Sequence, residues 1–383
     1  MENLVVQKYG GSSLSSVEKI QSIAKNLSEI AKKQSLIVVV SAMGKATDNL
    51  LNMAYEISDK PEKRELDMLL TSGERIAMSL LSIALNELGV SSVSFTGSQA
   101  GILTSNQHNS ASIVEIKPFR VSEVLKQKKV AILAGFQGVN PTTKEITTLG
   151  RGGSDTTAVY LADHFKAPCE IYKDVEGVCS ADPNQVSNVT KYDEITYDEL
   201  LSMIKWGNPI LHRYSIGLAK DKKVQLSIKK SLSKNTGTQI VLNKKTTANK
   251  CLSIESQALV FSIPCSEIKH YQTIKANKKL FTLYDLFQND TSLLITGEKA
   301  DLQCLKKTLR KSINNLSTVS FIFSNGDFKV YKKELISQLS KQFPSIVDWV
   351  DESLSLTAVI PFDLKTKFLN QASLFLKDYH SAR

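Results

Sequence analysis

Apolar positions along the first 230 residues follow two alternating patterns. Short apolar runs rich in β-branched residues predict buried strands, and segments with an apolar residue every three or four positions predict helices. The predicted strands are 4–7, 35–42, 91–97, 129–138 and 169–175, and the predicted helices include 46–57, 61–88 and 154–165. Ser15 followed by Glu18 matches a capping box, which predicts that the first helix starts there. The alternation predicts an α/β fold: an open, mostly parallel sheet with helices on both faces.

The pattern changes near residue 245. Residues 242–250 are polar and poor in apolar side chains, which is typical of a linker. The strands and helices predicted beyond this point are shorter, as in small α+β modules used for regulation or dimerisation. We therefore expect two domains, 1–245 and 250–383, which also suits a chain of 383 residues.

Charge and composition exclude several classes of protein. The formal net charge is +10, and the segment 220–250 carries nine lysines against the single acid Asp221. This run lacks interleaved aromatic residues and is broken by apolar segments, which favours a solvated surface or linker over a nucleic-acid site. The five cysteines form no C-x-x-C pair, so no metal or redox motif is indicated. Without a signal-peptide pattern or a run approaching ~20 apolar residues, we expect a cytoplasmic protein that binds neither membrane nor nucleic acid.

Several predicted strands end in small or charged residues. The first runs into "VVQKYGGSSL", where the glycines leave backbone N–H groups accessible and Lys8 adds a positive charge, a combination that suits phosphate. A tight turn with a solvated lysine is the alternative. The strands before 41–47, 135–138 and 174–177 end in a similar way. Because the carboxyl ends of parallel strands lie along one edge of a sheet, these turns predict a shared binding site.

The stretch "TTLGRGGSDTTA" at 147–158 carries the densest chemical signal. Three glycines surround Arg151, and a helix follows, whose N–H groups attract anions. Arg151 can hold a carboxylate through two hydrogen bonds. Asp155 is compatible either with a role in the site or with capping of the helix.

A third candidate is Glu74 in "TSGERIAMSLL" at 71–81. Its carboxylate is suited to hold an ammonium group, whereas the structural alternative is a first-turn acid that favours the helix dipole. Neither a G-x-x-x-x-G-K-[ST] phosphate loop nor a G-x-G-x-x-G dinucleotide fingerprint is present in the chain. Any phosphate site is therefore of another kind.

Five stretches resemble, in order and spacing, the motifs of aspartate kinases, which have the amino acid kinase fold. They are "VVQKYGGSSL", "VVVSAMGKATDNLL", "LLTSGERIAMSLL", "GFQGVNPTTKEITTLGRGGSDTTA" and "IYKDVEGVCSADP". The resemblance covers roughly 1–240, where "NTGTQIV" resembles the end of the catalytic domain. It implies transfer of the γ-phosphoryl group of ATP to the β-carboxylate of L-aspartate. The product, 4-phospho-L-aspartate, is the first intermediate towards lysine, threonine, methionine and diaminopimelate.

The resemblance also implies roles for single residues. Lys8 and Asp155 are the implied catalytic pair, Arg151 would bind the α-carboxylate of aspartate, and Glu74 would bind its amino group. The implied aspartate-binding residues are Ser41, Thr47, Glu74, Arg151, Gly152, Gly153 and Ser154. The implied ATP-binding residues are Lys8, Gly10, Gly11, Ser13, Tyr172, Lys173, Asp174 and Asp182. Mg²⁺ would be carried by ATP without direct protein ligands, and we expect a homodimer or higher homo-oligomer.

The chain departs from the family pattern on the nucleotide side. Lys173 stands where threonine is usual, Asn184 where arginine is usual and Pro209 where lysine is usual. The C-terminal region has the strand and helix order of paired ACT domains, but lacks an evident proline-glycine turn and effector asparagine. Two alternatives therefore remain: a kinase for another acidic amino acid, or a non-catalytic regulatory or ligand-binding protein of the same fold. The presence of Lys8, Glu74, Arg151 and Asp155 favours an active aspartate kinase.

Overall fold

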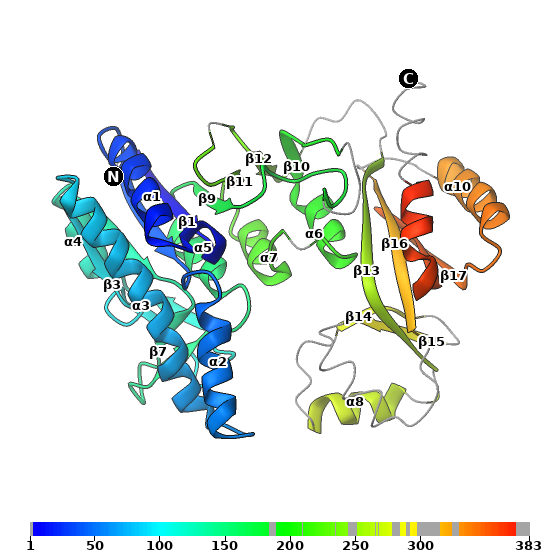
Figure 1. Ribbon diagram of the computed structural model, residues 1–383, viewed down its shortest axis with the longest axis horizontal. Helices are drawn as coiled ribbons and strands as arrows, with labels where there is room; N and C mark the ends of the chain where they lie inside the picture. The colour runs from blue at the N-terminus through cyan, green and yellow to red at the C-terminus, as the bar shows by residue number, and fades with distance from the viewer. Residues whose placement is uncertain are drawn as a thin grey trace. The chain divides into compact units, whose positions relative to one another are not determined.

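The chain forms two compact units, which are described separately (Figure 1). The computed structural model describes residues 3–183, 189–208, 210–233, 235–243, 251–264, 266, 268–277, 284–288, 292–296, 315–323 and 329–372. The first unit comprises Met1–Val178, Lys191–Tyr197 and Leu211–Asn243. The second comprises Cys179–Thr190, Asp198–Ile210 and Lys244–Arg383. Two segments from the N-terminal part of the chain thus group with the C-terminal part.

An eight-stranded sheet forms the centre of the first unit. Its strands are β1 (Leu4–Tyr9), β2 (Ser35–Val40), β3 (Ser92–Phe95), β6 (Val130–Ala134), β9 (Cys169–Lys173), β10 (Glu194–Thr196), β11 (Leu226–Lys230) and β12 (Thr238–Val241). They lie in the order β10-β12-β11-β9-β1-β2-β6-β3. All neighbours are parallel except β11 and β12. The predicted mostly parallel sheet is confirmed.

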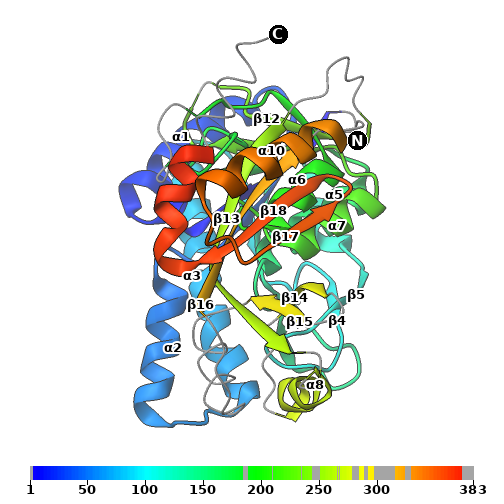
Figure 2. The same cartoon turned by 90° about the vertical axis from the view of Figure 1, so that its right-hand side faces the viewer.

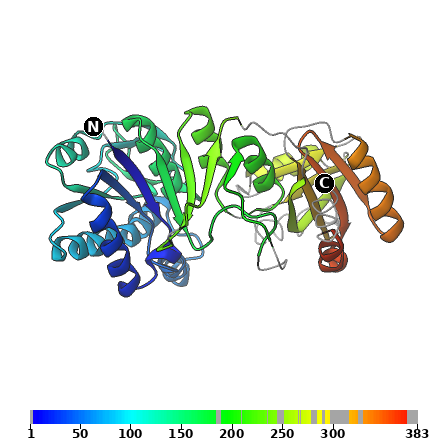
Figure 3. The same cartoon turned by 90° about the horizontal axis from the view of Figure 1, so that it is seen from above.

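Helices lie on both sides of this sheet (Figure 3). The helices of the first unit are α1 (Val17–Ala31), α2 (Ala46–Ile57), α3 (Lys63–Glu87), α4 (Phe119–Lys126), α5 (Gly153–Phe165) and α7 (Arg213–Asp221). The helix α6 (Tyr197–Lys205) begins at the last residue of a first-unit segment and continues in the second unit. The helices α1 and α3 share a hydrophobic core with β1, β2 and β6. The helix α5 packs on the other face, against β1 and β9. The helices predicted at 46–57, 61–88 and 154–165 are confirmed to within two residues.

The start of α1 differs from the capping-box prediction. Ser16, not Ser15, is the N-cap, and its Oγ accepts a hydrogen bond from the backbone N–H of Lys19 at 3.4 Å. The Ser15 hydroxyl instead accepts a hydrogen bond from Lys19 Nζ at 2.9 Å. Ser15 directly follows the 3₁₀ helix Gly11–Leu14 and has a helical backbone, whereas the N-cap Ser16 is extended, as an N-cap residue requires.

A smaller sheet lies beyond the carboxyl end of β6 and carries the loops of the candidate site. Its strands are β4 (Ile102–Thr104), β5 (Ile113–Ile116), β7 (Gln137–Val139) and β8 (Ile146–Thr148), in the order β5-β4-β7-β8. The strand predicted at 129–138 is wrong beyond Ala134, because Phe136 adopts a left-handed φ of 70° and Gln137 begins β7 in this smaller sheet. The strands β4, β5 and β8 were not predicted. The glycine-rich loop around Arg151 follows β8 directly.

The helix α3 has the length and apolar composition of a membrane-spanning helix. Within the described residues it is the one helix long and apolar enough to cross a membrane, contrary to the expectation that no stretch approaches such a length. Half of that apolar stretch is buried inside the protein, and Asp67 and Glu74 lie on its buried side. Core helices of soluble proteins pass the same test, so this is weak support for a membrane span.

The basic run at 220–250 has acidic partners on the surface of the first unit. These pairs lie 2.6–3.3 Å apart and involve partly exposed lysines, which supports the solvated-surface interpretation over a nucleic-acid patch. The pairs are Lys222 with Asp163, Lys229 with Glu170, and Lys230 with Glu176.

A six-stranded antiparallel sheet forms the second unit. Its strands are β13 (Cys251–Pro264), β14 (Tyr284–Gln288), β15 (Ser292–Thr296), β16 (Asn315–Phe323), β17 (Asp348–Glu352) and β18 (Ser355–Pro361), and its helices include α8 (Ile268–Asn277) and α10 (Lys329–Gln342). The strand order is β14-β15-β13-β16-β18-β17. The helix α10 covers β16 and β18, where Leu335 and Leu339 share a core with Phe321 (Figure 2). This confirms an α+β region.

Candidate active site

Lys8 and Asp155 form a buried ion pair at the carboxyl end of β1. Lys8 Nζ lies 2.7 Å from Asp155 Oδ1, and each side chain is 6% exposed. Side chains alternate along a strand, so Val5 and Tyr9 point into the α1–α3 core while Lys8 points towards α5. Burial by itself would raise the pKa of Asp155, but the charges of Lys8 and Lys173 hold it below its usual value. The pair therefore presents a fixed cation, not a solvated lysine.

The start of α5 shows that Asp155 does not cap it. The N-cap is Gly152, in a left-handed conformation with φ of 71°, and no side chain caps the helix. A Cβ on Gly152 would also lie 2.5 Å from His212 Cβ, so only glycine suits this position. Burial lowers the pKa of His212, although the Asp155 charge opposes this change. The capping interpretation of Asp155 is therefore wrong.

The turn after β1 packs against the turn after β2. A Cβ on Gly11 would lie 2.8 Å from the carbonyl oxygen of Ala42 and 3.1 Å from that of Gly44. The backbone N–H of Gly44 donates to Gly11 O at 2.9 Å. Gly10 is less crowded, and the Cβ position there lies 3.7 Å from Lys8 Nζ. The glycines therefore bring two turns together beside the buried ammonium group.

Glu74 lies inside α3, which begins eleven residues earlier at Lys63, and is 3% exposed. Its Oε1 accepts the backbone N–H of Ala42 at 3.1 Å, and its buried Oε2 has no hydrogen-bond partner among the described groups. Burial raises the pKa of Glu74 to about 7, although the Ala42 N–H and the Lys8 charge oppose the increase. The first-turn interpretation of Glu74 is therefore wrong, and its Oε2 is an acceptor suited to a cationic donor.

Arg151 is exposed between two left-handed glycines, Gly150 and Gly152. The loop that carries it is closely packed underneath. A Cβ on Gly153 would lie 2.9 Å from Leu149 Cβ, and one on Gly135, after β6, would lie 2.7 Å from Ser154 Cβ. The end of β6 and the first turn of α5 are thus in direct contact, which holds the Arg151 loop at the carboxyl edge of the sheet.

Asp67 is a buried acid that sequence reasoning missed. It is fully buried, and its carboxylate lies 2.6 Å from His108 Nδ1 and accepts Thr148 Oγ1 at 2.6 Å and the backbone N–H of Asn109 at 3.1 Å. The available signal was its position seven residues before Glu74, which places both acids on the same side of α3. A charge on the buried stripe of a helix marks a position with specific partners.

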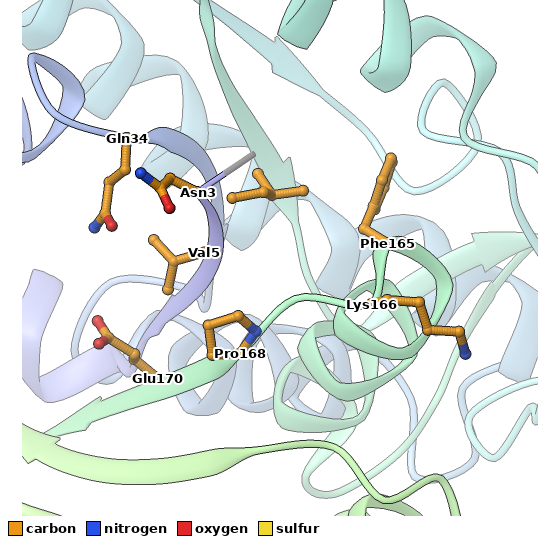
Figure 4. A pocket seen from close by; sticks show the side chains of 8 residues that line it. Asn3, Val5, Gln34, Phe165, Lys166, Pro168 and Glu170 are labelled. Carbon is orange, nitrogen blue, oxygen red and sulfur yellow. The ribbon is translucent and has the colours of Figure 1, made fainter. Parts of the chain in front are cut away.

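A separate pocket of about 350 Å³ lies at the opposite, amino-terminal end of the strands (Figure 4). The residues that line it are Asn3, Leu4, Val5, Gln34, Phe165, Lys166, Pro168 and Glu170. The Glu170 carboxylate already accepts hydrogen bonds from Gln7 Nε2, Tyr172 Oη and Lys229 Nζ at 2.6–2.9 Å. Its charge is therefore compensated within the protein, and the chemistry predicted from the sequence lies at the other end of the sheet.

Comparison with known proteins places this geometry in a family. The model of the amino acid kinase family matches residues 3–230, more than half of the chain. The chain belongs to the amino acid kinase family. Aspartokinase from Corynebacterium glutamicum is 48% identical over 241 residues, which are 62% of this chain and 57% of that protein. Aspartokinase 2 from Bacillus subtilis is 48% identical over 239 residues, 62% of this chain and 58% of that protein.

The matched region spans less than two thirds of the length of these relatives. Solved structures extend the similarity of fold to nearly the whole chain. Escherichia coli aspartokinase III in complex with aspartate and ADP gives a TM-score of 0.77 at 19% identity, covering 96% of this chain and 98% of that one. Aspartate kinase from Synechocystis gives 0.57 at 29% identity, covering 96% and 68%. The resemblance inferred from the sequence motifs is confirmed.

The remaining predicted residues of this amino acid kinase chain lie in different surroundings. The backbone N–H of Ser41 donates to Tyr9 O at 3.1 Å, and Thr47 lies in the first turn of α2. Ser13 Oγ lies 2.5 Å from Ser231 Oγ, on the segment after β11. The Tyr172 ring is buried and stacks on Tyr9 at 4.7 Å, on the face away from Lys8. Only the main chain of Tyr172 meets the glycine turn, where its carbonyl accepts Gly10 N–H at 3.3 Å.

Residues predicted for the nucleotide side are not all brought together. Lys173 ends β9 on the same face as Lys8, and burial lowers its pKa while the Asp155 charge opposes this. Asp174 follows it directly. Asp182 belongs to the segment 179–190, which groups with the second unit. Asn184 and Pro209 lie outside the described residues.

Proposed function

We propose that this chain transfers the γ-phosphoryl group of ATP to the β-carboxylate of L-aspartate and gives 4-phospho-L-aspartate. The observation that carries the proposal is the buried pair of Lys8 and Asp155 beside the glycine turn, because it fixes a cation where a phosphoryl group would sit. The aspartokinase relatives support aspartate as the acceptor.

At the phosphate end, the proposed ligands are the ammonium groups of Lys8 and Lys173 and the backbone N–H groups of the glycine turn. Lys8 Nζ lies 3.7 Å from the Cβ position of Gly10, so the ammonium group borders the glycine turn. The N–H groups of Gly10 and Ser13 already donate to Tyr172 O and Gly10 O, respectively. The proposed N–H ligands are therefore those of Gly11 and Ser12. Ammonium and N–H groups bind oxygen anions, not metal ions. Within the described residues no cluster of three His, Cys, Asp or Glu side chains is placed to hold a metal. We therefore propose Mg²⁺ bound through ATP, where it would neutralise phosphate charge.

At the aspartate end, Arg151 would bind the α-carboxylate and Glu74 the ammonium group. The Glu74 Oε2 is a buried acceptor without a described partner, which an ammonium donor would satisfy. The β-carboxylate of the substrate is ionised near neutral pH and attacks phosphorus directly, so no general base is needed. Catalysis then rests on alignment and charge neutralisation. Main-chain and hydroxyl groups would complete the site at Ser41, Thr47, Gly152, Gly153 and Ser154.

The direct test is ADP release by the purified full chain with ATP and Mg²⁺, in three parallel reactions. These contain L-aspartate, L-glutamate or no amino acid. Trapping of the acyl phosphate with hydroxylamine identifies the product independently of ADP. We expect ADP and hydroxamate only with aspartate. Glutamate-dependent turnover would make the chain a kinase for another acidic amino acid, and no turnover with either would make it a binding protein.

We propose that residues 250–383 form an ACT-like regulatory or dimerisation region and that the enzyme is a cytoplasmic homodimer or higher homo-oligomer. The support is the antiparallel sheet with α10 packed on one face, a compact α+β unit without a glycine-rich phosphate turn in its described part. Light scattering of the full chain measures the mass directly. A monomer at micromolar concentration would contradict the oligomer.

A further inference from the structure

The buried side of α3 holds three different parts of the candidate site. Asp67 binds the loop 105–110 and the end of β8. The carbonyl of Thr71 accepts Gln137 Nε2 at 3.1 Å, which ties the start of β7 to the same helix. Glu74 binds the turn after β2 through Ala42. Because a helix keeps its residues at fixed separations, α3 sets the distances between these loops.

The contacts of Asp67 converge on the segment that leads to Arg151. Thr148 is the last residue of β8, and its hydroxyl donates to Asp67 Oδ1 at 2.6 Å. The backbone N–H of Asn109 donates to the same carboxylate at 3.1 Å. The carbonyl oxygen of Asn109 lies 3.2 Å from the position that a Cβ on Gly150 would take. The Asp67 carboxylate thus binds both segments that lie next to Gly150, the left-handed glycine before Arg151.

We propose that Asp67 is a positioning residue for substrate binding, which acts by fixing the loop that carries Arg151. The proposal rests on the assignment of Arg151 to the α-carboxylate of aspartate. Arg151 is exposed, and a long side chain loses conformational freedom when it binds a ligand. Because the loop is already fixed at Thr148 and Gly150, less backbone conformational freedom is lost when Arg151 binds the substrate.

A purely structural role fits the position less well. The side chain of Asp67 is fully buried, and burial of a carboxylate carries a large desolvation cost that its partners must offset. An apolar residue would pack on the buried stripe of α3 without that cost. A charge with three donors from two separate segments instead specifies one geometry for those segments.

The test compares Asp67→Ala and Thr148→Val with the control Ser82→Ala. Ser82 is also buried on α3, and its hydroxyl lies 2.9 Å from Ser92 Oγ on β3, so the control loses a buried hydrogen bond of the same helix that involves neither β8 nor the Arg151 loop. We expect the aspartate KM to rise about tenfold in Asp67→Ala and about threefold in Thr148→Val, with the ATP KM and kcat changed by less than about twofold. The control should keep the wild-type KM for both substrates.

A double-mutant cycle separates positioning from general damage. If Asp67 acts through Arg151, the aspartate KM of Asp67→Ala with Arg151→Ala should equal that of Arg151→Ala alone, instead of the product of the two effects. Multiplied effects, or a folded Thr148→Val and Asp67→Asn with unchanged aspartate KM, would overturn the proposal. The Asp67→Asn and Thr148→Val variants also decide the question if Asp67→Ala fails to fold. Wild-type turnover of aspartate is measured first, so a failure of the proposed function is seen separately.

Discussion

Lys8 on β1 and Asp155 on α5 meet at 2.7 Å where both side chains are 6% exposed. The contact joins the end of β1, just before the glycine turn, to the first turn of the helix that follows Arg151. It therefore links the proposed phosphate end of the site to the proposed aspartate end. A pair that is so well buried responds strongly to the loss of either member.

Lys8→Ala should lower kcat by about a hundredfold or more, because one fixed charge at the transferring phosphoryl group is lost. Loss of one partner of a buried pair should also lower the free energy of unfolding by about 3 kcal/mol. Steady-state kinetics and urea unfolding measure the two effects. Lys32→Ala is the control, since Lys32 forms an exposed pair with Glu29. A folded Lys8→Ala enzyme with normal kcat would remove Lys8 from the mechanism.

Arg151→Ala should raise the aspartate KM by about thirtyfold and leave the ATP KM within about twofold, because the α-carboxylate takes no part in the reaction. Initial rates with one substrate varied at a time measure both constants. Arg64→Ala is the matched control: Arg64 is a partly exposed arginine that pairs with Glu145 and Glu65. A defect confined to ATP would move Arg151 to the nucleotide side and reverse the proposed orientation.

The kcat/KM for aspartate should fall as the pH falls below 7. Burial raises the pKa of Glu74 to about 7, and only the ionised carboxylate pairs with the substrate ammonium group. We expect roughly a fivefold loss from pH 7 to pH 6, since kcat/KM reports ionisation of the free enzyme. Glu74→Gln should show a lower value without this titration. A wild-type profile that is flat across this range would contradict the assignment of Glu74.

The same shift predicts how stability depends on pH. The pKa of Glu74 rises from 4.5 to about 7 on folding, so the folded state binds the proton more tightly than the unfolded state does. This contribution is fully present below pH 4.5 and is lost as the pH rises through 7, by up to about 3 kcal/mol. The Glu74→Gln variant has no carboxyl group at this position and lacks the contribution. Relative to wild type, the free energy of unfolding of Glu74→Gln should therefore increase as the pH is raised from about 5 to about 8. Urea unfolding at both pH values measures this difference, and a constant difference would contradict it.

Gly11→Ala should lower the free energy of unfolding by about 1–3 kcal/mol, because the new Cβ would lie against two backbone carbonyls. Gly10→Ala is the matched comparison. Gly10 has φ of −75° and ψ of 166°, which alanine adopts readily, and its Cβ would have ordinary contacts. Thermal unfolding should show an unchanged or slightly raised Tm for Gly10→Ala. Equal Tm values for both variants would show that the two turns do not need the close approach.

The local pattern of the sequence determined the main elements of the first unit. Continuous β-branched runs such as 35–40 are buried on both sides in a parallel sheet, so period and composition were sufficient to identify them. The strands β4, β5 and β8 were missed, and β7 was merged with β6 into one strand at 129–138, because a turn of two residues such as Gly135–Phe136 leaves no break in the apolar pattern. The cap of α1 was misplaced by one residue, because Ser15 and Ser16 have the same side-chain chemistry and only the backbone decides between them.

The sequence by itself determined which residue types are candidates for the chemistry: a lysine at the end of a strand, glycines around an arginine, and an acid within an apolar helix. Only the tertiary structure decided what each one touches. It placed Asp155 on Lys8 instead of on a helix cap, turned the Tyr172 ring into the core, and made Asp67 the anchor of the Arg151 loop. Such contacts join residues far apart in the chain, and burial there determines their charge and partners. Neither property can be seen in a local pattern of residues.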